Sequence, residues 1–219
     1  MRPVWTKEEL LEVMKAGKTV ASTFLEAVEI VRINSDAELN KLTFHIHDGW
    51  KSRPESWHFS ETMDNEIADV PCVFRLLSRH PHETDLPLKQ LLLQEIGIVT
   101  AQKYEVVRVH GRLLEVDSYE HLVATLKLEN GSVAHIEVAH GTNLTEVYEL
   151  EAASKAGILM YRNEPLPAFK TETISSLDKK GKEKQQEGRP YTYEEIKKAI
   201  EVVDLIYASI ENQKVEVVQ

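Results

Sequence analysis

The sequence predicts an α+β protein with an open, mostly antiparallel β-sheet whose helices pack on one face. Two stretches carry this prediction, because residues 122–128 and residues 133–138 alternate apolar and polar side chains with the period of two expected of half-buried strands. Asn130-Gly131 lies between them and is a strong hairpin signal, since both residues tolerate a positive φ. A sheet with one apolar face needs helices on that face, and the rest of the chain contains amphipathic helix patterns that supply them.

The turn of this hairpin is expected to hold three residues. The two apolar sets face the same side of the sheet only if the turn carries one extra residue, so Gly131 is predicted in the bulge position.

Length and composition indicate one globular domain or a domain and a half. The chain has 219 residues, of which 42% are hydrophobic and 28% charged.

The net charge of −10 argues against nucleic acid or an anionic membrane as partner. The single cysteine, Cys72, excludes an internal disulfide and fits a reducing cytosol, so we expect a cytoplasmic protein. No apolar run approaches the ~18 residues of a membrane-spanning helix, and the N-terminus lacks the apolar core of a signal peptide.

The N-terminal elements are predicted from caps and periodicity. Residues 5–17 read as a helix in which Thr6 and Glu9 form a capping box. Residues 18–23 read as a short strand, so that this helix-then-strand piece is typical of the end of a parallel α/β unit. A helix over 24–34 and a strand over 41–47 follow, the strand with Leu42, Phe44 and Ile46 facing inward.

The middle of the chain is less regular. Residues 48–60 form an aromatic loop in which Trp50 either lines a pocket or pins the loop to the body. Apolar residues at spacings of four and three predict a helix over 62–79, which kinks or restarts at Pro71. A turn at 80–82 and a helix over 88–96 are expected next.

The C-terminal half is predicted to add strands and a final helix. Beside the hairpin, strands are expected at 104–110, 146–152 and 158–161, and an exposed loop over 162–190. Thr192 and Glu195 form the capping box of the last helix, which a short strand over 214–218 follows.

Most chemically suggestive residues also have a plain structural explanation. His80 and His82 suit a turn better than a metal site, and no metal ligand set is predicted. Cys72 has no basic neighbour and is interpreted as an inert buried thiol. The outward face of the strands reads either as a solvated surface or as a dimer interface. The interface candidates are Thr43, His45, His47, His121, Val123, Thr125, His135 and Glu137.

The order of these pieces resembles the C-terminal part of the Gfo/Idh/MocA oxidoreductase family. The clearest match is residues 111–138, GRLLEVDSYEHLVATLKLENGSVAHIEV, which is similar to the family's sheet hairpin "A-T-L-x-F-x-N-G" ending in "E". Residues 149–159 resemble the strand pair that follows, and residues 190–218 resemble the closing helix and strand. Residues 38–42 resemble the family's "G-E-(I/L)-G-K-(V/L)" motif, which stands before its first sheet strand.

The resemblance implies a domain division and a set of altered positions. Residues 1–23 correspond to a remnant of the dinucleotide-binding (Rossmann) domain, and residues 24–219 to the C-terminal α+β domain. Most of the nucleotide-binding core, with its Gly-rich turn, has no counterpart. The family's "E-K-P" lysine falls on Arg2, and the histidine of its "D-x-x-x-H" helix falls on Ala68, so no catalytic residue is assigned.

Two function classes follow from this resemblance. The first is a noncatalytic oligomerisation or sugar-like ligand-binding module that binds no cofactor by itself and is inactive as an isolated chain. Its candidate ligand contacts are Trp50, Asp64, Asn65 and Asp69. The second is an NAD(P)-dependent oxidoreductase, or its substrate-binding half, acting on a sugar or polyol. The resemblance also implies a homodimer or tetramer formed through the open sheet face, with a separate Rossmann-domain chain as a further partner.

Overall fold

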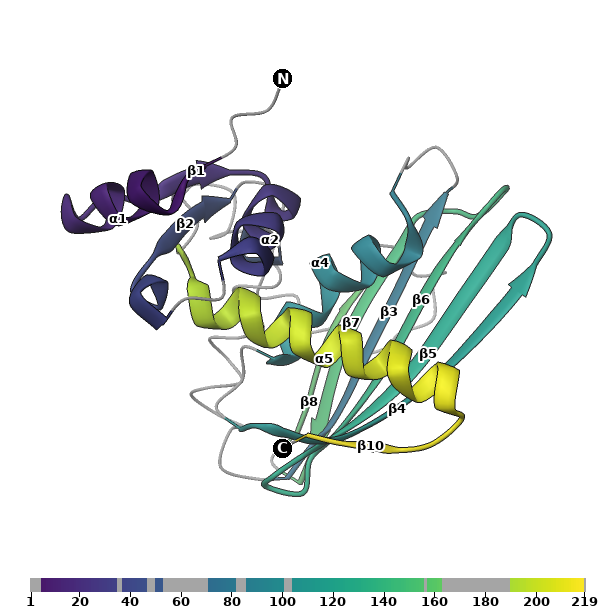
Figure 1. Ribbon diagram of the computed structural model, residues 1–219. Helices are drawn as coiled ribbons and strands as arrows, with labels where there is room; N and C mark the ends of the chain where they lie inside the picture. Colours follow the sequence, from purple (N-terminus) through teal and green to yellow (C-terminus); the bar gives the residue numbers. More distant parts are fainter. Residues whose placement is uncertain are drawn as a thin grey trace, which may run out of the picture.

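The computed structural model contains two β-sheets joined by helices (Figure 1). It describes residues 5–34, 37–46, 50–52, 71–81, 86–100, 104–155, 157–162 and 190–218. Two strands of the smaller sheet are linked through a helix, and a long C-terminal helix extends from the smaller sheet over the larger one. The predicted α+β class is therefore confirmed.

The larger sheet has seven strands in the order β10-β4-β5-β6-β3-β7-β8. Their bounds are β3 Val73–Pro81, β4 Val106–Val116, β5 Tyr119–Leu128, β6 Val133–Gly141, β7 Val147–Ser154, β8 Gly157–Arg162 and β10 Glu216–Val217. Every pair is antiparallel except β3 with β6, which is parallel. The predicted mostly antiparallel sheet is confirmed, and β4, β7 and β8 are longer than expected, whereas β10 is shorter than the strand predicted over 214–218.

The β5–β6 hairpin has the predicted three-residue loop. The Leu128 amide donates to the Ser132 carbonyl at 2.9 Å, and the Gly131 amide donates to the Leu128 carbonyl at 3.0 Å. Gly131 has φ +88°, the left-handed conformation of a G1 bulge, which costs glycine little. Leu122, Ala124 and the other apolar members of both strands consequently face the same side and are fully buried.

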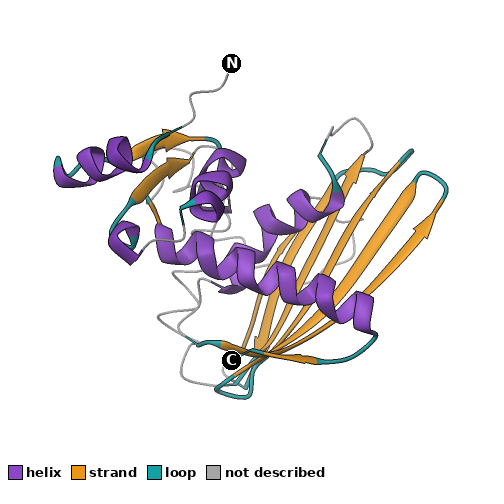
Figure 2. Cartoon of the chain, viewed as in Figure 1, coloured by secondary structure: helices purple, strands orange, loops and turns teal. Residues whose placement is uncertain are grey.

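Helices α4 (Leu88–Thr100) and α5 (Tyr193–Asn212) cover this apolar face (Figure 2). Helix α5 approaches β4 closely at Gly111, where an added Cβ would lie 2.9 Å from the Ile206 carbonyl oxygen. The Gly111 amide donates to Ser209 Oγ at 3.1 Å, which ties the helix directly to the strand. The predicted helix over 88–96 is confirmed and continues to Thr100.

The predicted helix over 62–79 is wrong in its described part. Residues 73–81 form strand β3, and the predicted turn at 80–82 begins with the end of that strand. The burial of this strand alternates except at Leu77, because Phe74, Leu76 and Ser78 are buried while Arg75 and Arg79 are exposed. Pairing with β6 and β7 on both sides overrides the spacings of three and four that suggested a helix. Residues 62–70 lie outside the described residues.

The smaller sheet combines two strands from the N-terminal part of the chain with one strand from the C-terminal part. Its strands are β1 (Val20–Ser22), β2 (Thr43–Ile46) and β9 (Tyr191–Thr192), in the order β1-β2-β9. β1 and β2 are parallel and are linked through helix α2 (Phe24–Ile33) and the short turn η1 (Ala37–Leu39). The predicted boundary after residue 23 falls inside this β-α-β unit. The division into a Rossmann remnant and a second domain stays a prediction.

The helix starts follow the predicted caps. Helix α1 (Lys7–Lys15) has the Thr6–Glu9 capping box and α5 the Thr192–Glu195 box. The Thr6 amide, donating to the Glu9 carboxylate, is the main reason that the pKa of Glu9 lies below its usual value. A third box, Thr23 with Glu26 at the start of α2, was not anticipated.

Replacing Thr192 by alanine is expected to destabilise the protein by about 1 kcal/mol, because the Glu195 amide loses the hydroxyl that caps it at 3.2 Å. Urea unfolding followed by circular dichroism measures the change. Thr192→Ser retains the hydroxyl and serves as the control. Equal loss in both variants would contradict a capping role.

Two further sequence predictions can be placed only in part. The predicted exposed loop over 162–190 lies, apart from its two end residues, outside the described residues. Within the part of the chain that the structure describes, none of the helices has the length and apolar character needed to cross a membrane.

Candidate functional site

The face of the large sheet opposite α4 and α5 carries an interlocked charge cluster centred on Glu137. His135 Nε2 lies 3.2 Å from Glu137 Oε1, and His121 Nε2 lies 3.7 Å from Glu137 Oε2. Arg75 Nη2 lies 3.9 Å from Glu137 Oε1. Three strands therefore contribute positively charged or protonatable groups to one carboxylate. The predicted placement of His121 and His135 with Glu137 on one polar face is confirmed.

Strand register extends this open face across all seven strands. Val123 pairs with Glu137 and Thr125 with His135, so both predicted neighbours lie on the same face. Large apolar side chains are also exposed there, since Val73 on β3 is 55% exposed and Ile158 on β8 is 60% exposed. The face is thus a mixture of charges and exposed apolar groups, a composition found at protein interfaces.

Two of the interface candidates do not share this face. Thr43 and His45 lie on β2, which belongs to the smaller sheet, so their predicted place beside His121 and His135 is wrong. His47 lies outside the described residues. Alternation along a strand predicts which residues share its face, but it does not predict which sheet the strand joins.

Charge is distributed unevenly over the open face. On β7, Glu149 forms a two-point pair with Arg162 of β8, with Arg162 Nε and Nη2 each 2.8 Å from a carboxylate oxygen. At the other side of the sheet, three basic residues have no ion-pair partner among the described residues, namely Arg108, Arg112 and Lys127. The β4–β5 side is therefore basic and the β7 side acidic.

A second polar cluster is buried between β3 and α4. Ser78 Oγ lies 2.7 Å from His80 Nε2, while Glu95 Oε1 lies 3.4 Å from Ser78 Oγ and 3.7 Å from His80 Nε2. Glu95 and Ser78 are almost completely buried. Both the hydroxyl and the carboxylate approach the same imidazole nitrogen, whereas a hydrolytic triad uses the two ring nitrogens separately. The arrangement is that of a hydrogen-bonded core cluster, and sequence reasoning missed it.

The acid–histidine spacing that the resemblance implies has a second possible location on α4. Glu95 is followed four residues later by Val99, on the helix that directly precedes β4 in the order of elements. Val99 is buried and apolar, so this location contains no acid/base group either. The location predicted from sequence, Asp64 to Ala68, lies outside the described residues. Arg2 and Asp69 are likewise outside the described residues.

Trp50 belongs to a packed aromatic junction, and its role as a ligand contact stays a prediction. Its ring is 2% exposed and stands edge-on to Tyr191 at 4.7 Å and to Phe24 at 5.4 Å between centroids. It also covers Gly97 of α4, where an added Cβ would lie 2.1 Å from the indole. Trp50 thus pins the short η2 turn (Trp50–Ser52) to the body of the protein, the alternative that the sequence left open.

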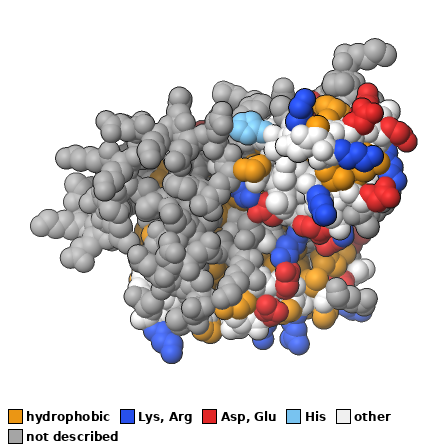
Figure 3. Space-filling view, turned by 90° about the vertical axis from the view of Figure 1, so that its left-hand side faces the viewer, with side chains coloured by type: hydrophobic (Ala, Val, Ile, Leu, Met, Phe, Trp, Pro, Cys, Tyr) orange, Lys and Arg blue, Asp and Glu red, His pale blue; other side chains and the backbone are white. Residues whose placement is uncertain are grey.

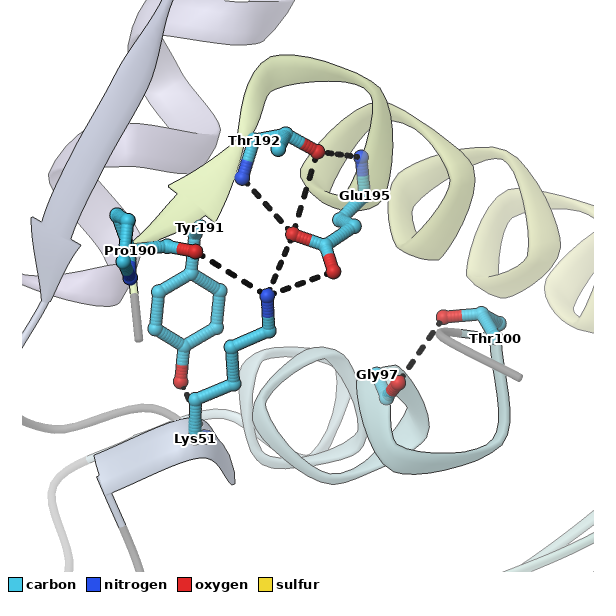
Figure 4. A network of polar contacts seen from close by, with 7 residues as sticks. All are labelled: Lys51, Gly97, Thr100, Pro190, Tyr191, Thr192 and Glu195. Atoms are coloured by element: carbon cyan, nitrogen blue, oxygen red, sulfur yellow. Dashed lines mark hydrogen bonds and ion pairs between the residues drawn. The ribbon is translucent and has the colours of Figure 1, made fainter. Parts of the chain in front are cut away.

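Lys51 also belongs to this junction, where both its ammonium group and its backbone amide form hydrogen bonds (Figure 4). Its Nζ lies 2.6 and 2.7 Å from the two carboxylate oxygens of Glu195 and donates to the Pro190 carbonyl at 3.2 Å. Its backbone amide donates to the Tyr191 hydroxyl at 2.5 Å. A lysine with this many acceptors is a structural tie between η2 and the start of α5 rather than a general base. No motif signals this contact, which joins residues far apart in sequence.

Cys72 is buried beside the β5–β6 turn at the start of β3, not on a helix as predicted. Its amide donates to Ser132 Oγ at 3.0 Å. Burial raises the pKa of the Cys72 thiol, which the nearby Ser132 hydroxyl offsets only in part. The predicted buried thiol is confirmed, and its environment disfavours the reactive thiolate.

A thiol reagent is therefore expected to label the native protein slowly, at the rate of local opening, and to label it at once in denaturant. Ellman's reagent at pH 8 measures one thiol per chain, because Cys72 is the only cysteine. Immediate labelling without denaturant would show that Cys72 is accessible.

The described residues contain no group of three or more His, Cys, Asp or Glu side chains arranged to hold a metal ion. Seen from the side of the smaller sheet, the described surface carries interspersed acidic and basic side chains (Figure 3). That side presents no continuous patch of one charge sign in the described part, in keeping with the absence of a basic composition.

Comparison of the whole fold identifies a class of known architecture. The structure has the fold of inositol dehydrogenases. It matches a myo-inositol dehydrogenase from Corynebacterium glutamicum over 97% of this chain and 76% of that one, with 12% identity and a TM-score of 0.67. It matches a scyllo-inositol dehydrogenase from Lactobacillus casei, solved with NAD(H) and scyllo-inositol, over 96% and 76%, with 13% identity and a TM-score of 0.66.

A third match is a myo-inositol dehydrogenase from Lactobacillus casei, solved with NAD(H) and myo-inositol, over 97% of this chain and 74% of that one. Its identity is 15% and its TM-score 0.65. No family model and no curated protein matches the sequence. The likeness therefore shows the fold, and it agrees with the oxidoreductase ancestry that the sequence resemblance implied.

Proposed function

We propose that this chain is a noncatalytic self-assembly module of oxidoreductase ancestry, which associates with a second copy through the open face of its large sheet. The observation that carries the proposal is the composition of that face. It exposes Val73 and Ile158 next to charges of both signs, and the described helices all pack elsewhere. A cytoplasmic location is part of the proposal, since the only cysteine is a buried thiol.

The altered acid/base positions support a noncatalytic role. Oxidation of a polyol requires a group that accepts the hydroxyl proton. On α4 the residue at the histidine spacing is Val99, and at the sequence-predicted location it is Ala68. The buried imidazole of His80 bonds to Ser78 inside the core, and Lys51 is saturated by Glu195.

Sedimentation at pH 7.5 tests the assembly. The wild-type chain is expected to sediment as a dimer or a larger even assembly, and Ile158→Asp is expected to weaken association about tenfold or more, because it places a charge in the apolar part of the interface. Ile33→Asp is the matched control, since Ile33 is also exposed but lies at the end of α2. A monomeric wild-type protein would refute the proposal.

The second candidate is an NAD(P)-dependent oxidoreductase, or the substrate-binding half of one, acting on a sugar or polyol. It is supported by the fold shared with dehydrogenases whose structures contain NAD(H) and inositols. A separate Rossmann-domain chain would then be the partner. Calorimetric titration with NADH and NADPH separates the two candidates, because micromolar binding would favour the enzyme and no binding at millimolar nucleotide would favour the module.

A further inference from the structure

The turn between β5 and β6 contains an asparagine followed by a glycine in an exposed position. Asn130 is the only asparagine of the chain that glycine follows. Its Oδ1 accepts a hydrogen bond from the Ser132 amide at 3.0 Å, so the side chain folds back over the peptide that joins it to Gly131. Gly131 is exposed, and a Cβ built on it would meet nothing within 4 Å. Water therefore reaches this peptide from the open side of the turn.

We propose that Asn130-Gly131 is a site of spontaneous deamidation, and that the isoaspartate formed there opens the turn that covers Cys72. Two features of the turn favour the reaction. The Ser132 amide polarises the side-chain carbonyl of Asn130, as a hydrogen-bond donor does when it stabilises an oxyanion. The ring that this hydrogen bond closes also contains both Asn130 Cγ and the Gly131 nitrogen, so the two reacting atoms are held in the same turn.

The reaction needs only water as a co-reactant. The Gly131 nitrogen loses its proton to hydroxide and attacks Asn130 Cγ, forming a new C–N bond, while the Cγ–Nδ2 bond breaks and ammonia leaves with a proton taken from water. Water then opens the cyclic imide at either carbonyl. Opening at Cγ gives aspartate, whereas opening at the main-chain carbonyl gives isoaspartate, in which the chain runs through Cγ. The net change consumes one water, releases one ammonia and involves no oxidation or reduction.

The hydrogen bonds of the folded turn slow the first step. The Gly131 amide donates to the Leu128 carbonyl at 3.0 Å, and the Leu128 amide donates to the Ser132 carbonyl at 2.9 Å. A bonded amide proton is removed only when the bond opens, so the nucleophile is released by local opening of the hairpin end. The folded chain is therefore expected to convert more slowly than the unfolded chain, but to convert without global unfolding.

Isoaspartate destroys the geometry on which this turn depends. It inserts one extra carbon into the main chain just before Gly131, which occupies the bulge position with φ +88°. Ser132 follows directly, and its Oγ accepts from the Cys72 amide at 3.0 Å and lies 3.6 Å from Cys72 Sγ. The Val133 amide donates to the Cys72 carbonyl at 3.0 Å. Because these contacts hold Cys72 against the turn, opening of the turn exposes a thiol that is buried in the unmodified protein.

Controlled ageing tests both steps. The protein is incubated folded and in guanidinium chloride at mildly alkaline pH, and isoaspartate is located by enzymatic methylation and peptide mapping. Conversion at residue 130 is expected in both samples, at a rate about tenfold lower in the folded one. Once converted, the folded protein is expected to react with Ellman's reagent at Cys72 about tenfold faster than the fresh protein.

The matched variant is Asn130→Gln, which keeps the amide but would have to close a larger and more slowly formed ring. It is expected to label as slowly after ageing as before it. Asn143 is an internal control that is expected not to convert, because it is exposed in a turn with φ +63° but is followed by Leu144, whose side chain obstructs the attack.

Two results would overturn the proposal. If the folded wild-type chain gains no isoaspartate while the unfolded chain does, the folded turn is not a modification site. If residue 130 converts without faster labelling of Cys72, or if aged Asn130→Gln also labels faster, the link between the turn and the thiol is wrong.

Discussion

Replacing His80 by leucine is expected to destabilise the protein by about 3 kcal/mol or more. The change removes an imidazole that lies 2.7 Å from Ser78 Oγ and 3.7 Å from Glu95 Oε1, inside the contact between β3 and α4. Glu95 is completely buried, so its carboxylate would lose a polar neighbour without gaining access to water. Removing one partner from a buried polar cluster can cost more than the cluster itself contributes, because the remaining group keeps its desolvation cost with one interaction fewer to offset it.

Chemical denaturation measures the loss, and a second substitution identifies its cause. Adding Glu95→Met to His80→Leu replaces the buried carboxylate, which has one polar neighbour fewer, by an apolar group of similar length and is expected to recover part of the stability. A double variant no more stable than His80→Leu would show that the imidazole contributes by filling space rather than by hydrogen bonding.

Replacing Gly97 by alanine is expected to destabilise the protein by about 2 kcal/mol, although alanine is the better helix former. The added Cβ would lie 2.1 Å from the Trp50 ring, a distance that requires the ring or the helix to move. The indole cannot turn away freely, since it is packed edge-on against Phe24 and Tyr191. Overpacking costs about 1–3 kcal/mol, and a contact this short belongs at the upper end, so that about 2 kcal/mol remains after the gain of about 1 kcal/mol from helix propensity is subtracted.

A double-mutant cycle isolates the contact with Trp50. Trp50→Ala alone is expected to cost about 3–5 kcal/mol through the cavity that it leaves. In that background the Gly97→Ala change should become neutral or stabilising, since the clash is gone and only the helix propensity remains. An equal loss in both backgrounds would mean that the strain at Gly97 comes from another neighbour.

Local sequence features predicted a large part of the fold. The hairpin follows from two alternating runs and Asn130-Gly131, because turn type and register are decided by residues adjacent in sequence. The capping boxes at Thr6 and Thr192 follow from a four-residue pattern for the same reason. Strand β3 was missed because its apolar residues also fit helical spacing, and only its pairing with β6 and β7 decides between the two.

The candidate site was harder to predict from the sequence, because its contacts join residues that are far apart along the chain. His121, His135 and Glu137 were correctly grouped, since they belong to one hairpin. His45 was grouped with them wrongly, because nothing local shows which sheet a strand joins. Ser78 and Glu95 meet only through the packing of β3 against α4. The available signal was the polar Ser78 and His80 at the inward positions of a strand whose other inward residues are apolar.

The position of α5 has a consequence for synthesis on the ribosome. The segment 190–218 supplies β9 to the smaller sheet, α5 to the cover of the larger sheet, and β10 to its edge. Neither sheet can be completed while this segment is still inside the exit tunnel, even though the hairpin forms from residues made much earlier. A nascent chain arrested before residue 190 should therefore expose its apolar sheet face and recruit chaperones, whereas one extended beyond residue 218 should release them.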